Sequence, residues 1–193
     1  MKRFIAIIMA AMLIFSFAAC STPATQEPTT EAVVEAVAPL DLLNTVWASY
    51  AEDEKFPAAG GDMLTDETTS WEGPAAFSLD AEALNASLHF PTESVSKIDD
   101  AASLVHAMNA NTFTAGVFHV ANSADVDALT QEITATINST QWMCGFPEKM
   151  LIATVGDTIV ACVGNTDLID TFNAKLAAAY PEAVVVENAA IVA

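Results

Sequence analysis

Two short apolar runs near the end of the chain restrict its fold more than any other feature. KMLIATV (residues 149–155) and TIVACVG (158–164) are separated only by Gly156-Asp157. A two-residue connection of this composition is typical of a β-hairpin turn. The sequence therefore predicts an antiparallel pair of strands in which Cys162 lies opposite Leu151.

The segments on either side of this hairpin predict one more strand and two helices. Residues 112–121 (TFTAGVFHVA) are dense in β-formers, which indicates a strand that is apolar on both faces. Apolar residues recur every three or four positions from Asp125 to Ile137, and again from Thr166 to Leu176. This spacing predicts two amphipathic helices, the second with Thr166 as its cap.

The N-terminal half of the domain is less regular. A helix capped by Asp41, a long loop over 52–73 and an ambiguous stretch with a short helix over 74–91 are expected. A further helix is predicted from Thr92 onward. Its apolar stripe comprises Val95, Ile98, Ala102, Val105 and Met108.

Together these elements predict one α+β domain over residues 39–193. Its core order is strand, helix, hairpin, helix, and VVVENAAIVA (184–193) can add a closing strand. We expect a small, largely antiparallel sheet with the helices packed on one face.

The first twenty residues have the features of a processing signal. Lys2 and Arg3 precede an apolar run over 4–17, which is shorter than the roughly 20 residues of a membrane-spanning helix. The run ends in Ala18-Ala19-Cys20 and closely resembles the lipobox of bacterial lipoproteins, with Phe17 where that family usually carries Leu. An ordinary secretory peptide and an uncleaved membrane span are the alternatives.

The lipobox resemblance implies a cellular location for the protein. Residues 1–19 would be removed as a signal peptide, and Cys20 would carry a diacylglyceryl group and a fatty acyl chain such as palmitate. Two acyl chains suffice for stable anchoring at the extracytoplasmic face of the cell membrane. Residues 20–38 would then form a flexible tether, because 21–38 is rich in Thr, Pro, Ala and Glu without any aromatic residue. A helix at EAVVEAVA is the alternative there.

Charge excludes one class of partner. Without Lys2 and Arg3 the chain keeps four basic residues, all lysines, against 25 acidic ones. Nucleic-acid binding depends on Lys and Arg that neutralise phosphates, and bidentate phosphate recognition is mainly the work of arginine. We therefore expect no nucleic-acid partner, and an acidic domain that anionic lipid repels.

Residues 141–150 (QWMCGFPEKM) resemble a thioredoxin active site at first reading. Such a site needs a second cysteine three positions after the first, but Pro147 stands three positions after Cys144. Cys144 and Cys162 could form a structural disulfide in an oxidising compartment, or they could be two separate thiols. The sequence predicts no catalytic residue here.

Exposed aromatic residues are the better candidates for contact with a partner. Trp71 lies in the long loop, and Trp142, Cys144 and Phe146 lie in the turn over 141–147. Tryptophan and other aromatic residues are enriched at binding surfaces. The alternative for Trp142 and Phe146 is a hydrophobic plug at the edge of the sheet.

The sequence contains no pattern that is typical of a metal or cofactor site. His89, His106 and His119 have no metal-ligand spacing, and the hard-oxygen residues Asp62, Asp66 and Glu67 do not follow the EF-hand pattern. No G-x-S-x-G turn or glycine-rich phosphate loop occurs. We expect no metal and no cofactor, and an enzyme is the less favoured class.

A second resemblance concerns the domain itself. MNANTFTAGVFHVA, QWMCGFPEKM and VGDTIVACVG, within residues 95–178, make it similar to small uncharacterised α+β lipoproteins of Gram-positive gut bacteria. That resemblance implies a fold and a location without an activity. The leading hypothesis is a membrane-anchored surface lipoprotein with an acidic domain that binds an unidentified protein or small molecule. The alternatives are an accessory envelope redox factor that uses Cys144, and a hydrolase whose site the sequence does not reveal.

Overall fold

The computed structural model describes residues 37–62, 69–143 and 145–191, which belong to one compact unit. The predicted signal peptide, Cys20 and the tether up to residue 36 lie outside the described residues. Within the described part, no helix is both long and apolar enough to cross a membrane.

The described strands form one seven-stranded sheet in which every pair is antiparallel. Its order is β1-β3-β4-β6-β5-β7, and β2 also pairs with β3. The strands are β1 (Ala58–Ala59), β2 (Ala75–Ala76), β3 (Ile98–His106), β4 (Phe113–Val120), β5 (Lys149–Val155), β6 (Thr158–Gly164) and β7 (Val184–Ala190). The predicted hairpin is confirmed as β5–β6, with Leu151 opposite Cys162.

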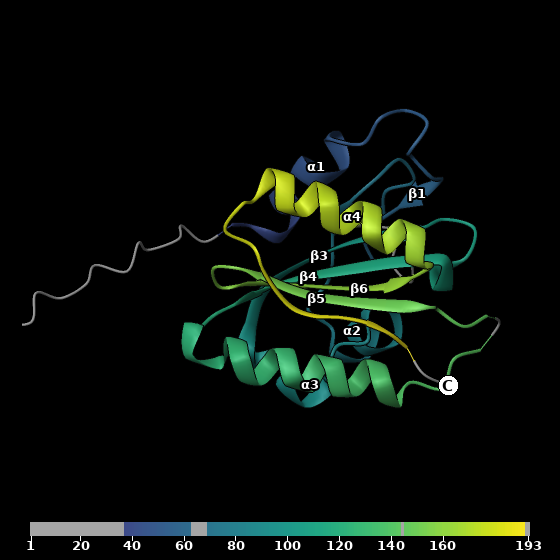
Figure 1. Cartoon of the computed structure of the whole chain (residues 1–193). Coiled ribbons are helices and arrows are strands. Elements are labelled where there is room, and N and C mark those ends of the chain that lie inside the picture. The colour runs from purple at the N-terminus through teal and green to yellow at the C-terminus, as the bar shows by residue number, and fades with distance from the viewer. Residues whose placement is uncertain (1–36, 63–68, 144, 192–193) are drawn as a thin grey trace, which may run out of the picture. The chain divides into compact units, whose positions relative to one another are not determined.

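Helices cover both faces of this sheet (Figure 1). The α-helices are α1 (Pro39–Ala48), α2 (Ala81–Leu88), α3 (Val126–Ser139) and α4 (Thr166–Ala179), and 3-10 turns are η1 (Thr92–Lys97), η2 (Ala110–Thr112) and η3 (Ser123–Asp125). Helices α1 and α4 pack on one face, and α2 and α3 pack on the other.

The α+β class and the antiparallel sheet are therefore confirmed, but the expectation that all helices pack on one face is wrong. The physical reason lies in the central strands. Every residue of β6 is buried, and so is every residue of β4 except the half-buried His119. A strand that is apolar on both faces needs a cover on both faces.

Two hydrophobic clusters result, one on each side of the sheet. Leu42, Leu43 and Val46 of α1 and Ile169, Phe172 and Leu176 of α4 form the helical part of the first cluster. Leu84 and Leu88 of α2 and Leu129, Ile133 and Ile137 of α3 form that of the second. The clusters meet the sheet through alternate residues of the same strands, as Cys162 and Val163 of β6 illustrate.

The predicted helix from Thr92 to Met108 is wrong. Residues 92–97 form the 3-10 turn η1, and the strand β3 begins at Ile98. The apolar spacing was compatible with a helix, but pairing with β4 along 98–105 determines the conformation. Met108, the last residue of the supposed stripe, is exposed.

Three smaller differences concern the ends of elements. Asp41 lies in the first turn of α1 rather than at its cap, and Asn165 rather than Thr166 occupies the cap position of α4. The expected loop over 52–73 contains β1 and an isolated bridge between Gly60 and Ser70. The short helix expected within 74–91 is α2, which Asp80 caps by accepting a hydrogen bond from the Ala83 amide at 2.9 Å.

Candidate functional site

A cavity of about 210 Å³ lies on the α2 side of the sheet, beside β3. Five separate segments form its wall: the loop at Gly61, Phe77 after β2, the end of α2, β3, and the stretch from η2 into β4. The apolar part of the wall comprises Phe77, Leu88 and Val105, and the polar part includes Ser87, His89, Ser103, Asn111 and Thr114. Among the residues that the structure describes, no lysine, arginine, aspartate or glutamate lines it.

Two of these polar side chains hold the wall together. The buried Ser103 hydroxyl accepts a hydrogen bond from the Gly61 amide at 2.9 Å and donates to the Gly61 carbonyl at 3.4 Å. The Thr114 hydroxyl donates to the Ala110 carbonyl at 2.9 Å. Ser87 and His89, by contrast, have no side-chain hydrogen bond to another described residue, so both can bond a molecule in the cavity.

His89 has an unusual backbone for a residue with a side chain. It ends α2 with φ 56°, the left-handed region, and among the described residues it alone does so without being glycine. The Phe90 amide donates to the Leu84 carbonyl at 3.3 Å, which completes a C-terminal cap where glycine is the usual residue. A histidine in this position incurs a steric cost, and such costs often accompany functional sites.

The His89 imidazole packs against an aromatic ring. Its ring meets the ring of Trp142 edge-on, with 4.7 Å between centroids. Burial lowers the pKa of His89 to about 4, because desolvation disfavours the charged form. His89 also borders a second, shallower groove between α2 and α3, of about 340 Å³. The neutral imidazole thus has one donor and one acceptor nitrogen at the junction of the two hollows.

We expect His89 to make the domain less stable in acid. Its pKa in the folded state lies below its ordinary value of 6.5, so the unfolded chain binds more protons between pH 6.5 and pH 4. The stabilisation from neutral His89 is complete above pH 6.5 and is lost as the pH falls toward 4. Urea unfolding of the wild type and of His89→Asn, which tolerates the left-handed backbone, should therefore diverge over this window. Parallel stability curves would contradict the assignment.

Asn111 connects the cavity to the turn over 141–147. Its side-chain amide donates to the carbonyl of Met143 at 2.9 Å and to that of Gly145 at 3.1 Å. Its backbone amide donates to the Asn109 side-chain oxygen at 3.0 Å, which fixes η2. The turn, which leads into β5, is therefore held beside the cavity by one asparagine of η2, which directly precedes β4.

The predicted contact residues lie in different environments. Trp142 is half-buried against the α2/α3 cluster, while Met143 is 79% exposed and Phe146 is 42% exposed. The Trp142 and Phe146 rings are 6.4 Å apart. Trp71 is exposed and follows Ser70, which pairs with Gly60. Cys144 lies outside the described residues. In this turn, Trp142 therefore packs against the hydrophobic cluster, whereas Met143 and Phe146 are exposed to solvent.

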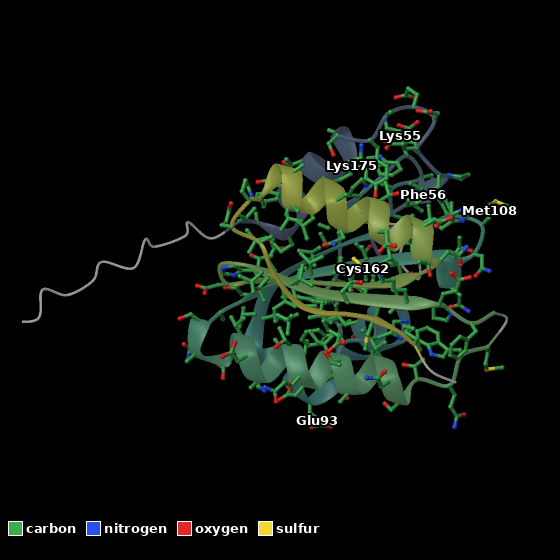
Figure 2. The ribbon with its side chains drawn as sticks, in the orientation of Figure 1. Lys55, Phe56, Glu93, Met108, Cys162 and Lys175 are labelled. Atoms are coloured by element: carbon green, nitrogen blue, oxygen red, sulfur yellow. The ribbon has the colours of Figure 1, made fainter. Side chains whose placement is uncertain are left out.

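Cys162 lies far from this surface chemistry. It forms no disulfide with another described residue and is fully buried between β6 and the α1/α4 layer, as Figure 2 shows. Burial raises the pKa of its thiol above the ordinary value. Tyr50 lies in the same cluster, and its hydroxyl has no hydrogen-bond partner within the described part of the chain. The pairing of Cys162 with Cys144 stays a prediction, because Cys144 is not described.

The other residues considered from the sequence do not gather. The His106 ring stacks on Phe56 at 5.5 Å, and His119 Nδ1 lies 2.5 Å from the Asp99 carboxylate at the far end of β4. Asp62 is buried and accepts a hydrogen bond from Ser78, whereas Asp66 and Glu67 lie outside the described residues. The described residues contain no cluster of three or more potential metal ligands from His, Cys, Asp and Glu.

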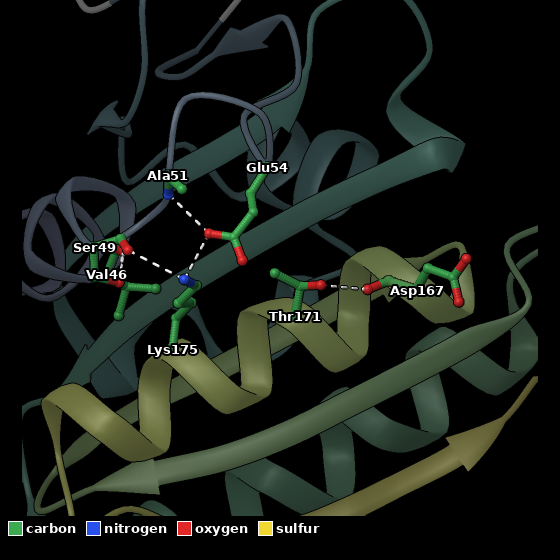
Figure 3. Close-up of polar contacts among 7 residues, drawn as sticks. All are labelled: Val46, Ser49, Ala51, Glu54, Asp167, Thr171 and Lys175. Atoms are coloured by element: carbon green, nitrogen blue, oxygen red, sulfur yellow. Dashed lines mark hydrogen bonds and ion pairs between the residues drawn. The ribbon is translucent and has the colours of Figure 1, made fainter.

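All four lysines of the described residues are in ion pairs. The pairs are Lys55–Glu52, Lys97–Glu132, Lys149–Asp170 and Lys175–Glu54. Figure 3 shows Lys175 of α4, whose ammonium lies 2.6 Å from Glu54 and donates to the Ser49 carbonyl at 3.2 Å. Exposed pairs of this kind stabilise the fold little. Each described lysine thus lies beside a carboxylate, which weakens its attraction for an anionic partner.

Sequence reasoning missed the residues that form the cavity. It considered His89 only as a metal ligand, and it gave Ser87, Ser103 and Asn111 no role. One local signal was available, a histidine directly after a short helical segment where glycine is usual. The other residues come from separate segments, and no spacing in the sequence relates them.

The fold and the cavity define an α+β domain that has helices on both faces of an antiparallel sheet and a small cavity beside β3, without charged residues among its described lining. The chain matches no protein-family model, and neither a curated protein nor a solved structure shows significant similarity to it.

Proposed function

We propose that this protein is a lipoprotein anchored at the extracytoplasmic face of a cell membrane, and that its acidic domain binds a small uncharged ligand in the cavity. The lipobox-like segment ending at Cys20 supports the anchor, and the uncharged cavity supports the binding role. The turn over 141–147, with its exposed Met143 and Phe146, supplies an apolar rim.

The observation that carries the proposal is the chemistry of the cavity wall. It pairs an apolar surface with Ser87 and His89, whose side chains are free to bond a ligand. An anionic ligand would find no cation there and would be repelled by a chain of net charge −19. A cationic ligand would find no carboxylate among the described residues of the wall. The best match is a neutral molecule that carries hydroxyl or amide groups and one apolar face.

Size restricts the ligand further. A volume of about 210 Å³ lies below the roughly 300–1,000 Å³ of pockets for drug-sized ligands, so the ligand must be small. This suits one sugar ring or one amino-acid amide. A chain of such units could continue into the groove between α2 and α3, which shares Ala86 and His89 with the cavity.

Amide chemical shifts in NMR spectra test the binding role. The probes are N-acetylglucosamine and N-acetyl-leucine amide, with glucose 6-phosphate and leucine methyl ester as charged counterparts. Either neutral probe should shift the amide signals around Ser87, His89 and Asn111, and the charged ones should not. Ser87→Ala should weaken binding several-fold, whereas the matched change Ser96→Ala in the exposed part of η1 should not. Equal binding of charged probes, or no response to either neutral probe, would refute the proposed ligand class.

The anchor needs a separate test. Mass spectrometry of the membrane fraction should find a mature chain that begins at Cys20 with two or three acyl chains attached. Cys20→Ala should abolish this mass and move the protein out of the membrane fraction. An acyl-free chain with an intact N-terminus would contradict the lipoprotein assignment and leave the cavity proposal untouched.

Thiol reactivity separates the binding role from the redox alternative. We expect Cys162 to be inert in the folded domain, because it is fully buried and its pKa is raised. In Cys144→Ser of the fragment 33–193, which spans the compact unit and lacks Cys20, Ellman's reagent should detect no thiol under native conditions and one after unfolding. With Cys144 restored, a fast-reacting thiol of low pKa would favour the redox factor. Rapid labelling of Cys162 itself would contradict the packing described for β6.

A further inference from the structure

The two edges of the sheet differ in how they are protected. Strands β1 and β2, which flank β3, have only two residues each, and very short strands are a common way to blunt an edge. The other edge is β7, with seven residues, and it pairs only with β5 among the described strands. In Figure 1 this segment is the yellow stretch that crosses in front of β5. Its outer side leaves backbone amides and carbonyls open to a further strand.

The β7 edge is also apolar. Val184, Val185 and Val186 are all exposed, by 46 to 59% of their surface, and no lysine or proline interrupts the strand. The register between β5 and β7 shifts between Ile152 and Ala153, so Val186 is the extra residue of a bulge. Val186 and Glu187 both line a shallow groove of about 340 Å³ against α3. An incoming strand would therefore find a ready place for side chains beside the free edge.

Charge decides between a second copy of this chain and a different partner. Residue 187 is the midpoint of the strand, so two copies paired antiparallel over its full length would place their Glu187 side chains opposite each other. Like charges directly opposite destabilise a strand pair. The net charge of −19 adds repulsion between whole copies, and each described lysine already has an acidic partner. A strand with a cation opposite Glu187 is free of both penalties.

We propose that the free edge of β7 binds an extended segment of another protein, which adds a strand to the sheet and places a lysine or arginine near Glu187. Backbone hydrogen bonds to β7 supply affinity, the exposed valines bury apolar side chains, and Glu187 selects the charge. This surface is distinct from the cavity, so the inference does not depend on the proposed ligand.

An acetylated and amidated eight-residue peptide of alternating threonine and valine with one central lysine is a suitable probe. In NMR titrations of residues 33–193 it should shift the amide signals of 184–190 and leave those of Ser87 and His89 unchanged. A peptide with glutamate in place of lysine should bind at least tenfold more weakly. Added salt should reduce the difference between the two peptides.

Two variants with the same change in net charge complete the test. Glu187→Gln should weaken binding of the lysine peptide several-fold, whereas Glu182→Gln, which lies before the strand, should change it less than twofold. An unchanged amide spectrum away from β7 verifies that each variant is folded. Equal binding of both peptides, shifts confined to another surface, or self-association of the wild type that the β7 variants abolish would each overturn the proposal.

Discussion

Replacing Phe172 with alanine should lower the free energy of unfolding by about 3–5 kcal/mol, the range for deleting a buried phenylalanine. Phe172 is fully buried on the inner face of α4. Its ring lies 5.6 Å from that of Phe113 on β4, so the side chain joins the helix to the middle of the sheet. Its removal leaves a cavity at the centre of the α1/α4 cluster, which neighbouring strands cannot fill without moving.

Phe146→Ala is the matched control, because the chemistry is the same while the Phe146 side chain is 42% exposed. We expect it to cost less than about 1 kcal/mol, as surface changes usually do. Urea unfolding followed by tryptophan fluorescence gives both values. A cost for Phe172→Ala no larger than that of the control would mean that α4 does not depend on this contact.

The second large effect is expected at Gly60. A Cβ atom there would lie 2.4 Å from the Ala75 nitrogen, 2.6 Å from the Ser103 oxygen and 2.7 Å from the Gly73 oxygen. All three are backbone atoms, so no side chain can move aside. Gly60→Ala should therefore cost about 1–3 kcal/mol or more, as overpacking of a close contact does.

The change should also reach the cavity. Gly60 pairs with Ser70 through two hydrogen bonds of 2.9 and 2.8 Å, and the next residue, Gly61, lines the cavity through its bonds to Ser103. Gly73→Ala is the control, because its Cβ would meet only the Trp47 side chain, at 3.1 Å. Thermal unfolding compares the two variants, and amide shifts at Ser103 report on the cavity wall. Equal stability of the two variants would contradict the close packing at Gly60.

Prediction from the sequence succeeded where the signal was local. The β5–β6 hairpin depends on a two-residue turn in which Gly156 adopts φ 57°, a conformation that glycine takes without strain. Helices α3 and α4 followed from apolar residues at helical spacing, and β4 followed from a dense run of β-formers between two asparagines. In each case, neighbours along the chain carry the information.

Prediction failed where distant partners decide the outcome. Residues 98–106 have apolar spacing that fits a helix, but they pair with β4 on one side and with β1 and β2 on the other. A strand conformation is favourable there only because those partner strands are present. The local sequence pattern of residues 98–106 carries no information about these partners. The sequence predicts that both faces of β4 are apolar, but the full burial of β6 and the helices on both faces depend on tertiary packing.

The sequence alone determined the order of most elements, the antiparallel hairpin, and the excess of acidic over basic residues. These depend on short-range periodicity, on turn residues and on composition. Only the tertiary structure decided the state of β3, the two-sided helical cover and the cavity, whose wall joins Gly61, Ser87, Ser103 and Asn111 from four segments. Residues so far apart along the chain become neighbours through packing and strand pairing, and that is the physical reason why the candidate site could not be found by reading the sequence.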